Sequence, residues 1–406
     1  MNDSLAAAPL FHGVPIVFAV FAAILVGVLL FHRRSLEIAL GGLGVILTLR
    51  LGFSPFRLLA HLSEEWVKLV NLFGLLVGFT LLADHFERSQ IPAQLPRRLP
   101  RGPWGCFALL FMIWLLSGLL DNIAAAMIGA TTAAALFRRR LHLGYLAAIV
   151  GAANAGGAGS VVGDTTTTMI WLDGVSPLKM LPAYTGAFTA LVVFGALASL
   201  QQHRHAPLER QEGIPPSVDR RHLTIVAVAL AIMVATNVIS SQLWRGDDQP
   251  LPFLAMALWL VLLIGGLVRP LNRALVPGAV RSGLFLLALV FAASLMPVQA
   301  LPPPGWETTL GLGAISALFD NIPLTKLALN QGGYDWALLA YAVGFGGSMV
   351  WFGSSAGVVV ATAFPEARSA PRWLRAAWHI PIAFLLGFAV QYALHGWHPL
   401  LEASGQ

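Results

Sequence analysis

Acidic side chains inside long apolar segments constrain this chain more than any other feature. Asp121 and Asp320 each lie within an apolar run, and each begins the sequence Asp-Asn-Ile. A charged residue at the centre of a bilayer costs roughly 2.5–3.5 kcal/mol on insertion scales, so such residues usually serve a function. The same sequence in both parts of the chain therefore indicates two related halves with an acid in each.

A glycine-rich segment follows each Asp-Asn pair and also repeats. Its residues Gly156, Gly157, Gly163, Asp164 and Thr165 align with Gly346, Gly347, Gly353, Ser354 and Ser355. Non-helical backbone at membrane depth is tolerated only where protein buries it or where it lines a wet cavity. We therefore expect the two Asp-Asn turns and the two glycine breaks to meet and form one binding site.

The composition is that of a membrane protein. Of the 406 residues, 57% are hydrophobic and 11% charged, whereas soluble domains are about 25% charged. Apolar runs long enough to span a bilayer recur throughout. The net charge of +6 would suggest nucleic acid binding in a soluble protein, but here the basic residues are topology signals. The expected partners are therefore the lipid bilayer and small ions, with no nucleic acid.

Cofactors and processing signals are not expected. The single cysteine, Cys106, excludes a disulfide framework and offers no metal cluster. The first apolar run has no basic segment before it and no clear cleavage site after it, so we expect no removable signal peptide.

The apolar runs divide the chain into residues 1–200, a polar cytoplasmic linker at 201–221, and residues 222–406. The first half contains expected crossings at 15–31, 36–51, 67–83 and 184–200, an interrupted segment at 104–137 and a glycine-broken segment at 143–172. The second half repeats this order at 222–243, 251–268, 280–297, 308–331, 336–364 and 378–395.

Charge determines how the interrupted segment 104–137 is threaded. As straight helix it is about 50 Å long, too short for two crossings of the ~30 Å hydrocarbon core and long for one. Both of its flanks are basic, with Arg97, Arg98 and Arg101 before it and Arg138, Arg139 and Arg140 after it. Cytoplasmic loops are enriched in Lys and Arg, so both flanks are predicted to be cytoplasmic. A re-entrant hairpin satisfies this.

With such a hairpin in each half, most of the 25 lysines and arginines fall on the cytoplasmic side. The exceptions are Arg50, Arg57, Lys68, Lys179, Arg245 and Lys326. Five crossings per half make the second half inverted relative to the first, which is a transporter architecture. The predicted fold is an all-α polytopic membrane protein of two inverted repeats of five transmembrane helices, each with one re-entrant helical hairpin and one discontinuous helix. Its termini are predicted to be periplasmic, at a bacterial inner membrane.

Asp164 is the strongest candidate for ion binding. Its repeat partner is Ser354, so the repeated backbone does not require a carboxylate there. Thr165 to Thr168 follow it, and hydroxyl and carboxylate oxygens are hard ligands that suit Na⁺ or Li⁺. We predict Na⁺ at Asp164, Asp121 and Asp320. The alternative is that these acids are helix caps, and at least two of the threonines are expected to bond to their own helix.

Neighbouring polar residues complete the predicted site. Asn122 and Asn321 are expected to orient the adjacent aspartate, to cap a helix or to ligate an ion. The full candidate set is Asp121, Asn122, Asn154, Asp164, Thr165, Thr166, Asp320, Asn321, Ser354 and Ser355. Lys326 has Met127 as its counterpart, and three roles remain open for it: a counter-ion to Asp320 or Asp164, a proton-coupled group, or a side chain reaching the outer surface.

At these motifs the sequence resembles the ion transporter superfamily, and within it the NhaD-type sodium/proton antiporters. The resemblance is carried by residues 120–123, 163–169, 320–323 and 353–358. Related sequences include those called citrate transporters and arsenite pumps. The resemblance implies two hairpins, two broken helices and elevator-like or rocking alternate access, often in a homodimer. Lys326 departs from the pattern expected of the antiporters.

Three functions are compatible with the sequence. The first is Na⁺(Li⁺)/H⁺ exchange, in which a buried aspartate holds either a proton or a cation. The second is Na⁺- or H⁺-coupled transport of an anion such as citrate, a dicarboxylate or arsenite, held at helix N-termini. The third is an intramembrane aspartyl protease, but the Gly-x-Gly-Asp sequence is absent because Val161 replaces the first glycine. We therefore predict a transporter and not an enzyme.

Overall fold

The computed structural model describes most of the chain. The described residues are 10–11, 14–31, 34–53, 56–94, 99–208, 217–243, 250–298 and 301–399. Within them the chain is helical apart from a two-stranded antiparallel pair, β1 (Leu10–Phe11) and β2 (Val14–Pro15). Parts of the predicted linker and the flanking residues Arg33, Arg97, Arg98, Arg210 and Arg245 lie outside the described residues.

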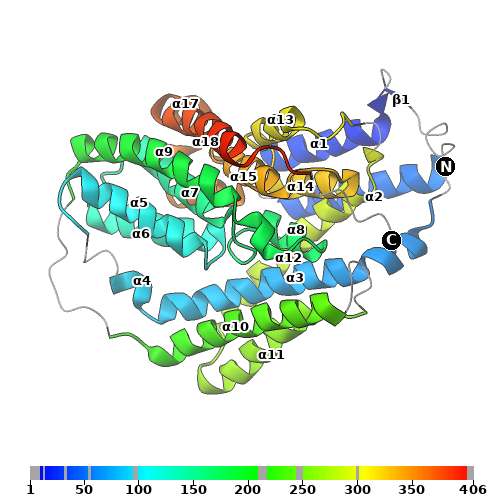
Figure 1. The fold of residues 1–406 in the computed structure, drawn as a ribbon, viewed down its shortest axis with the longest axis horizontal. Helices are drawn as coiled ribbons and strands as arrows, with labels where there is room; N and C mark the ends of the chain where they lie inside the picture. Colours follow the sequence, from blue (N-terminus) through cyan, green and yellow to red (C-terminus); the bar gives the residue numbers. More distant parts are fainter. Residues whose placement is uncertain are drawn as a thin grey trace.

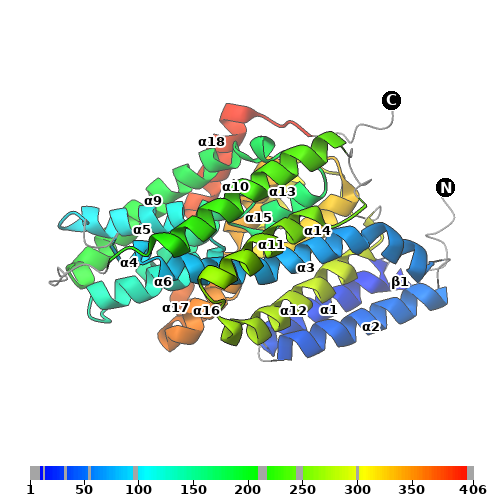
Figure 2. The ribbon, with the colours of Figure 1, turned by 90° about the horizontal axis from the view of Figure 1, so that it is seen from below.

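One set of helices, which we call the long-helix group, forms the lower part of Figure 1 and its right-hand edge. It comprises α1 (Ile16–Leu30), α2 (Ser35–Phe53), α3 (Leu58–Arg88), α10 (Arg220–Leu243), α11 (Phe253–Val268) and α12 (Val276–Ser294). α3 packs against α10, α11 and α12, while α12 packs against α2, which in turn packs against α1. Figure 2 shows α1, α2 and α12 side by side.

The remaining helices form a second set, the site group. Its first-half members are α5 (Pro103–Ser117), α6 (Asn122–Leu136), α7 (Leu143–Gly157), α8 (Thr165–Leu172) and α9 (Ala183–His205). Its second-half members are α13 (Trp306–Ser316), α14 (Asn321–Gln331), α15 (Trp336–Gly346), α16 (Ser355–Ala363), α17 (Ala370–Ala376) and α18 (His379–His395). The short elements are α4 (Ile91–Gln94), η3 (Pro177–Met180), η5 (Arg273–Leu275) and η7 (Pro365–Arg368).

Helix length and apolarity agree with a polytopic membrane protein. Among the described residues, four helical stretches are long and apolar enough to cross a bilayer, and a fifth qualifies if the bent α17–α18 pair is one span. The four are Ser35–Phe53, Leu58–Arg88, Pro177–His205 and Arg273–Ser294. α5 and α6 have 15 residues each, about 22 Å of helix, so neither alone spans a ~30 Å core.

The two halves pack in matching ways. α5 packs on α7 as α13 packs on α15, and α6 contacts α16 as α14 contacts α8. α5 and α6 lie at the left of Figure 1, whereas α13 and α14 lie toward the right. Each turn between paired helices is thereby brought against the break of a neighbouring helix near the middle of the molecule.

Glycines permit this close approach at matching places. A Cβ on Gly156 would collide with the backbone carbonyl of Trp114, and a Cβ on Gly346 would collide with that of Gly313. Each pair joins the end of a broken helix to the helix that precedes the Asp-Asn turn in the same half, α5 or α13. These glycines are therefore needed for backbone-to-backbone contact rather than for an unusual φ.

Predicted segment positions were close to those observed, with two differences of extent. α3 begins at Leu58, well before the expected crossing at 67–83, because Leu58 to Val67 continue the helix through its charged residues. α9 continues to His205, so residues 201–205 are helical rather than linker. The predicted turns at Asp121 and Asp320 and the glycine breaks fall where expected.

Replacing Gly156 with alanine is expected to lower the melting temperature of the detergent-solubilised protein, because overpacking a close backbone contact costs about 1–3 kcal/mol. Gly278→Ala is the matched control, since a Cβ there meets nothing within 4 Å. Equal melting temperatures for Gly156→Ala and Gly278→Ala would contradict the contact.

Candidate functional site

Four helices begin at the centre of the site group, and the N-cap residue of each is a polar residue of the repeated motifs. The helices are α6, α8, α14 and α16. Asp121 precedes α6 with φ −51° and ψ 141°, and Asp320 precedes α14 with φ −55° and ψ 142°. Asp164 precedes α8 with φ −139° and ψ 136°, and Ser354 precedes α16 with φ −142° and ψ 152°. The two halves thus present the same backbone to the same centre.

Each turn is fastened to a broken helix by a serine at the end of the helix before the turn. Ser117 Oγ donates to the carbonyl of Ala153 at 2.5 Å, and Ser316 Oγ donates to that of Val343 at 2.7 Å. These bonds occupy matching positions in the two halves. Sequence reasoning missed both serines, because a lone serine before a turn carries no signal of its own until the repeat is aligned.

The first turn has a further tie to the break after α7. Asn122 N donates to Gly163 O at 3.1 Å, and Ser160 Oγ donates to Gly118 O at 2.7 Å. Ser160 Oγ also accepts from the backbone amides of Val162 and Gly163. Ser160 therefore has a structural role here, holding the break and the turn together.

Asp164 lies at the centre of these elements and is 2% exposed. Its Oδ1 accepts hydrogen bonds from the amide nitrogens of Asn122 at 3.4 Å and Asn321 at 3.3 Å, one from each turn. Thr166 lies beside the carboxyl, but within the described residues neither its hydroxyl nor Asp164 Oδ2, both buried, makes a hydrogen bond of normal geometry. A buried carboxylate oxygen without a donor is costly in a protein interior, so it is suited to bind a proton or a cation.

Asn154 connects the two broken helices. Its Oδ1 accepts from Asn122 at 3.2 Å, and its Nδ2 donates to Ser348 Oγ at 2.9 Å and to Ser354 Oγ at 3.0 Å. At the matching position of the second half is Gly344, where a Cβ would lie 3.1 Å from Asp164 Oδ2. Gly344 therefore leaves room for the Asp164 carboxylate, and the longer Asn154 amide reaches the short side chain of Ser354.

The two turn aspartates differ in their bonding. Asp320 Oδ1 accepts from the backbone amide of Ile322 at 3.2 Å, and its Oδ2 accepts from Ser355 Oγ at 2.8 Å. Within the described residues, no matching hydrogen bond joins Asp121 to Thr165, and Asp121 makes no side-chain cap. Asp320 is therefore a bonded cap, whereas the Asp121 carboxylate and the Thr165 hydroxyl remain available to a ligand.

The threonine run divides as predicted. Thr167 Oγ1 donates to the carbonyls of Ser160 and Asp164, and Thr168 Oγ1 donates to those of Val161 and Asp164. The expectation that at least two of the four threonines bond to local backbone is confirmed. Of the other two, Thr165 lines the central cavity and Thr166 lies beside the Asp164 carboxyl.

A cavity of about 60 Å³ joins these groups to the long-helix group. Its polar lining from the site group includes Asp121, Asn122, Asp164, Thr165, Asn321 and Ser355. Thr80 of α3 and Ser282 of α12 line the opposite wall. Such a volume holds a few water molecules or a bare cation rather than a large organic anion.

Two further observations bear on the predicted cation site. Lys326 Nζ pairs with Glu65 Oε2 at 2.9 Å, so the acid beside it belongs to α3 rather than being Asp320 or Asp164. Within the described part of the chain, no group of three acidic, histidine or cysteine side chains is close enough to hold a metal ion. A cation at Asp164 would therefore need hydroxyl and carbonyl oxygens or water as additional ligands.

Comparison with known proteins finds several sodium/proton antiporters. The chain is 26% identical over 317 residues to sodium/proton antiporter 1 of Arabidopsis thaliana, covering 69% of this chain and 52% of the relative. Antiporter 2 of the same plant is 28% identical, covering 61% of this chain and 67% of the relative. The Na⁺/H⁺ antiporter NhaD of Alkalimonas amylolytica is 26% identical, covering 71% of this chain and 68% of the relative.

These relatives confirm the predicted resemblance to sodium/proton antiporters, and their names agree with a transporter rather than an enzyme. The match spans about half the length of the first plant relative. No protein-family model matches the chain. Among solved structures, the YdaH transporter of Alcanivorax borkumensis is 15% identical with a TM-score of 0.48, covering 83% of this chain and 87% of its own. The apolar helices of this chain, together with the antiporter relatives, identify it as an integral membrane protein.

Asn321→Ala is expected to lower the melting temperature, because hydrogen bonds to a charged group contribute about 1.5–3 kcal/mol. In an Asp164→Asn background the same change should cost less, since the acceptor is then neutral, and a double-mutant cycle measures the difference. Asn272→Ala is the control, because that amide bonds to Asp84 instead. Equal losses for Asn321→Ala in both backgrounds would show that the bond to Asp164 is unimportant.

Proposed function

We propose that this chain is a secondary active transporter that exchanges Na⁺ or Li⁺ for H⁺, with Asp164 as the residue for which both ions compete. The observation that carries the proposal is the buried Asp164 carboxylate, whose Oδ1 is held by an asparagine from each turn while Oδ2 has no donor. The names of the relatives support the same activity.

Competition at one carboxylate is sufficient for exchange. A proton on Oδ2 neutralises Asp164, and a bound cation compensates its charge, but the two cannot be held at the same oxygen. The ionised and empty carboxylate is the costly state in a dry interior. If only the proton-loaded and cation-loaded states can change access, protons and cations must cross the membrane in opposite directions.

The cation ligands we propose lie mainly on the first-half side of the centre. Asp164 Oδ2 and the hydroxyl of Thr166 are without partners, and Thr165 and Asp121 line the same cavity. Asn122, Asn321 and Asn154 hold the carboxylate and the two breaks in place. Asp320 and Ser355 bond each other and make a second, more structural acid site, while Ser354 is engaged by Asn154.

The architecture we propose for this function is the predicted pair of inverted repeats, residues 1–200 and 222–406. In it α5–α6 and α13–α14 are re-entrant hairpins, and α7–α8 and α15–α16 are broken helices. The matched serine bonds, the matched cap angles and the short α5 and α6 support this arrangement. A homodimer, a bacterial inner membrane and periplasmic termini remain predictions from the sequence.

Transport of an anion is less compatible with the site. Helix N-termini attract anions through their dipoles, but three of the four that meet here carry an aspartate as cap. The carboxylates occupy the positions that an anionic substrate would need. Lys326, the positive charge nearest in the sequence to Asp320, is paired with Glu65.

Asp164→Asn is expected to abolish Na⁺-driven and Li⁺-driven proton movement in proteoliposomes, down to the level of protein-free liposomes, because the amide cannot exchange a proton for a cation. A pH-sensitive dye in the lumen measures the flux. Asp219→Asn is the matched control, since Asp219 lies outside the membrane helices beside Arg269 and should retain full flux. Full flux in Asp164→Asn would remove Asp164 from the mechanism.

Thermal stabilisation by ligand distinguishes cation exchange from anion transport. A ligand present at 100 times its Kd stabilises the folded state by about 2.7 kcal/mol. We expect Na⁺ or Li⁺ alone to raise the melting temperature, less so at low pH, and to have no effect on Asp164→Asn. A rise that requires citrate or arsenite would favour the anion transporter instead.

A further inference from the structure

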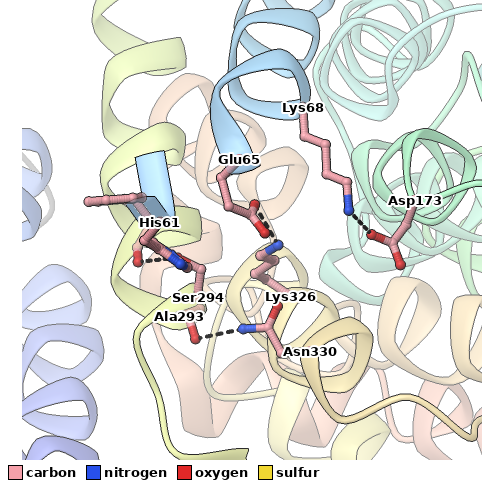
Figure 3. A network of polar contacts seen from close by, with 9 residues as sticks. His61, Glu65, Lys68, Asp173, Ala293, Ser294, Lys326 and Asn330 are labelled. Carbon is pink, nitrogen blue, oxygen red and sulfur yellow. Dashed lines mark hydrogen bonds and ion pairs between the residues drawn. The ribbon is translucent and has the colours of Figure 1, made fainter. Parts of the chain in front are cut away.

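Two ion pairs connect the long-helix group to the site group on one face of the molecule. Lys326 of α14 pairs with Glu65 of α3 at 2.9 Å, and Lys68 of α3 pairs with Asp173 at the end of α8 at 2.7 Å (Figure 3). Glu65 and Lys68 are one helical turn apart on α3. The α3 helix is thus paired with the end of α8 and with the middle of α14, and the first residues of these two helices form the ion site.

The pairs lie close above the ion site, and the Lys326–Glu65 pair is better shielded from water than the Lys68–Asp173 pair, whose side chains are each 21% exposed. Lys326 is about 7.5 Å along α14 from Asn321, and Asp173 follows α8, which is about 12 Å long. The side chain of Lys326 is 6% exposed and that of Glu65 is 16% exposed. Neutral bonds surround the pairs: His61 to Ser294, and Asn330 to the carbonyl of Ala293.

An apolar layer separates the ion pairs from the site. The small cavity beneath them, about 20 Å³, has room for about one water molecule. Its apolar lining is Leu69, Leu72, Met169, Leu172, Val290 and Leu329. Leu72, Met169 and Val290 belong to one buried cluster. This face, which we call the Glu65 face, is therefore closed to a hydrated ion.

The opposite face, bearing Arg281 and Ser35, is open. A cavity of about 240 Å³ runs from those residues to Asp320 and Ser355 between α12 and α16. It shares Ser282 and Leu286 with the cavity at the ion site. α3 packs on α8 and α12 packs on α14, whereas α6 and α16 make at most marginal contact with α3 and α12 among the described elements.

The site-group members of the two ion pairs, Lys326 and Asp173, have no charged counterpart in the repeat. The position matching Lys326 is Met127, and the one matching Asp173 is Ala363. A device needed only to support the fold would be expected on both faces, because the packing of the two halves matches elsewhere. The charges instead occur on the single face that is closed here.

We propose that the Glu65–Lys326 and Lys68–Asp173 pairs form a gate that holds the Glu65 face shut, and that both pairs separate when the ion site opens to that face. Separation would break both ion pairs in a poorly hydrated interface, which is tolerable only once water reaches their charges. Opening and hydration of this face are therefore coupled, so the gate favours a fully shut or a fully open state. The inference rests on the proposed function for its effect on flux, but the gate itself can be tested without flux.

Cysteine accessibility tests the gate directly. The chain has one cysteine, so Cys106→Ala gives a cysteine-free background. Thr80→Cys, on the wall of the ion-site cavity, is the reporter. A membrane-impermeant methanethiosulfonate reagent is applied to right-side-out and inverted vesicles. With the gate intact, we expect labelling from the Arg281 face and protection from the Glu65 face.

Breaking the gate should remove that protection. Lys326→Met and Glu65→Gln are each expected to raise labelling from the Glu65 face by about tenfold or more, as the open state gains population. The charge-swapped pair Glu65→Lys with Lys326→Glu should restore protection. Glu37→Gln is the control, because it breaks an ion pair of similar length with Arg281 inside the long-helix group and should leave Glu65-face labelling unchanged.

Unchanged protection in Lys326→Met and Glu65→Gln would overturn the gate, and so would a charge-swapped variant that labels like the single variants. If the single variants do not fold, Glu65→Cys with Lys326→Cys, joined by a bifunctional methanethiosulfonate crosslinker, takes their place. Crosslinking should stop Na⁺-driven flux and reduction should restore it, whereas flux that continues after complete crosslinking overturns the gate. Loss of all flux in the unmodified protein would contradict the proposed function alone, since labelling would still report the gate.

Discussion

One carboxylate shared between two halves organises the centre of this protein. Asp164 accepts from Asn122 and from Asn321, which stand at the starts of helices that come from opposite parts of the chain. Separating the two turns would leave the buried oxygen with fewer donors, and that cost holds them together. A movement that exposes the site would therefore carry both turns and α8 as one body, leaving the ion's surroundings unchanged.

The packing between the two helix groups fits such a movement. Within the site group, serine bonds and glycine contacts tie backbone to backbone at Ser117, Ser316, Gly156 and Gly346. Between the groups, α3 meets α8 and α12 meets α14 mainly through apolar side chains and two ion pairs. Apolar surfaces slide at lower cost than hydrogen-bonded backbone, so the interface is the weaker boundary.

The sequence predicted the positions of the helices and most residues of the central site, because both depend on apolar composition and on the repeated motifs. An acid in an apolar run is costly, so Asp121, Asp164 and Asp320 stood out, and their segments began close to where they were expected. It did not reach the partner of Lys326, because Glu65 was placed at a segment end. The prediction also began α3 too late, because the segment was defined by its apolar run, whereas the helix continues back to Leu58 through the charged Glu64 and Glu65.

The exchange between Asn154 and Gly344 has a consequence for how the duplicated halves diverged. A long amide faces the short Ser354, while a residue without a side chain faces the long Asp164. Either change alone would be unfavourable. An asparagine at position 344 would crowd Asp164, and a glycine at position 154 would remove the hydrogen-bond donor to Ser354. Residues 154 and 344 therefore constrain each other, and in the proposed mechanism this asymmetry would place the cation on the Asp164 side.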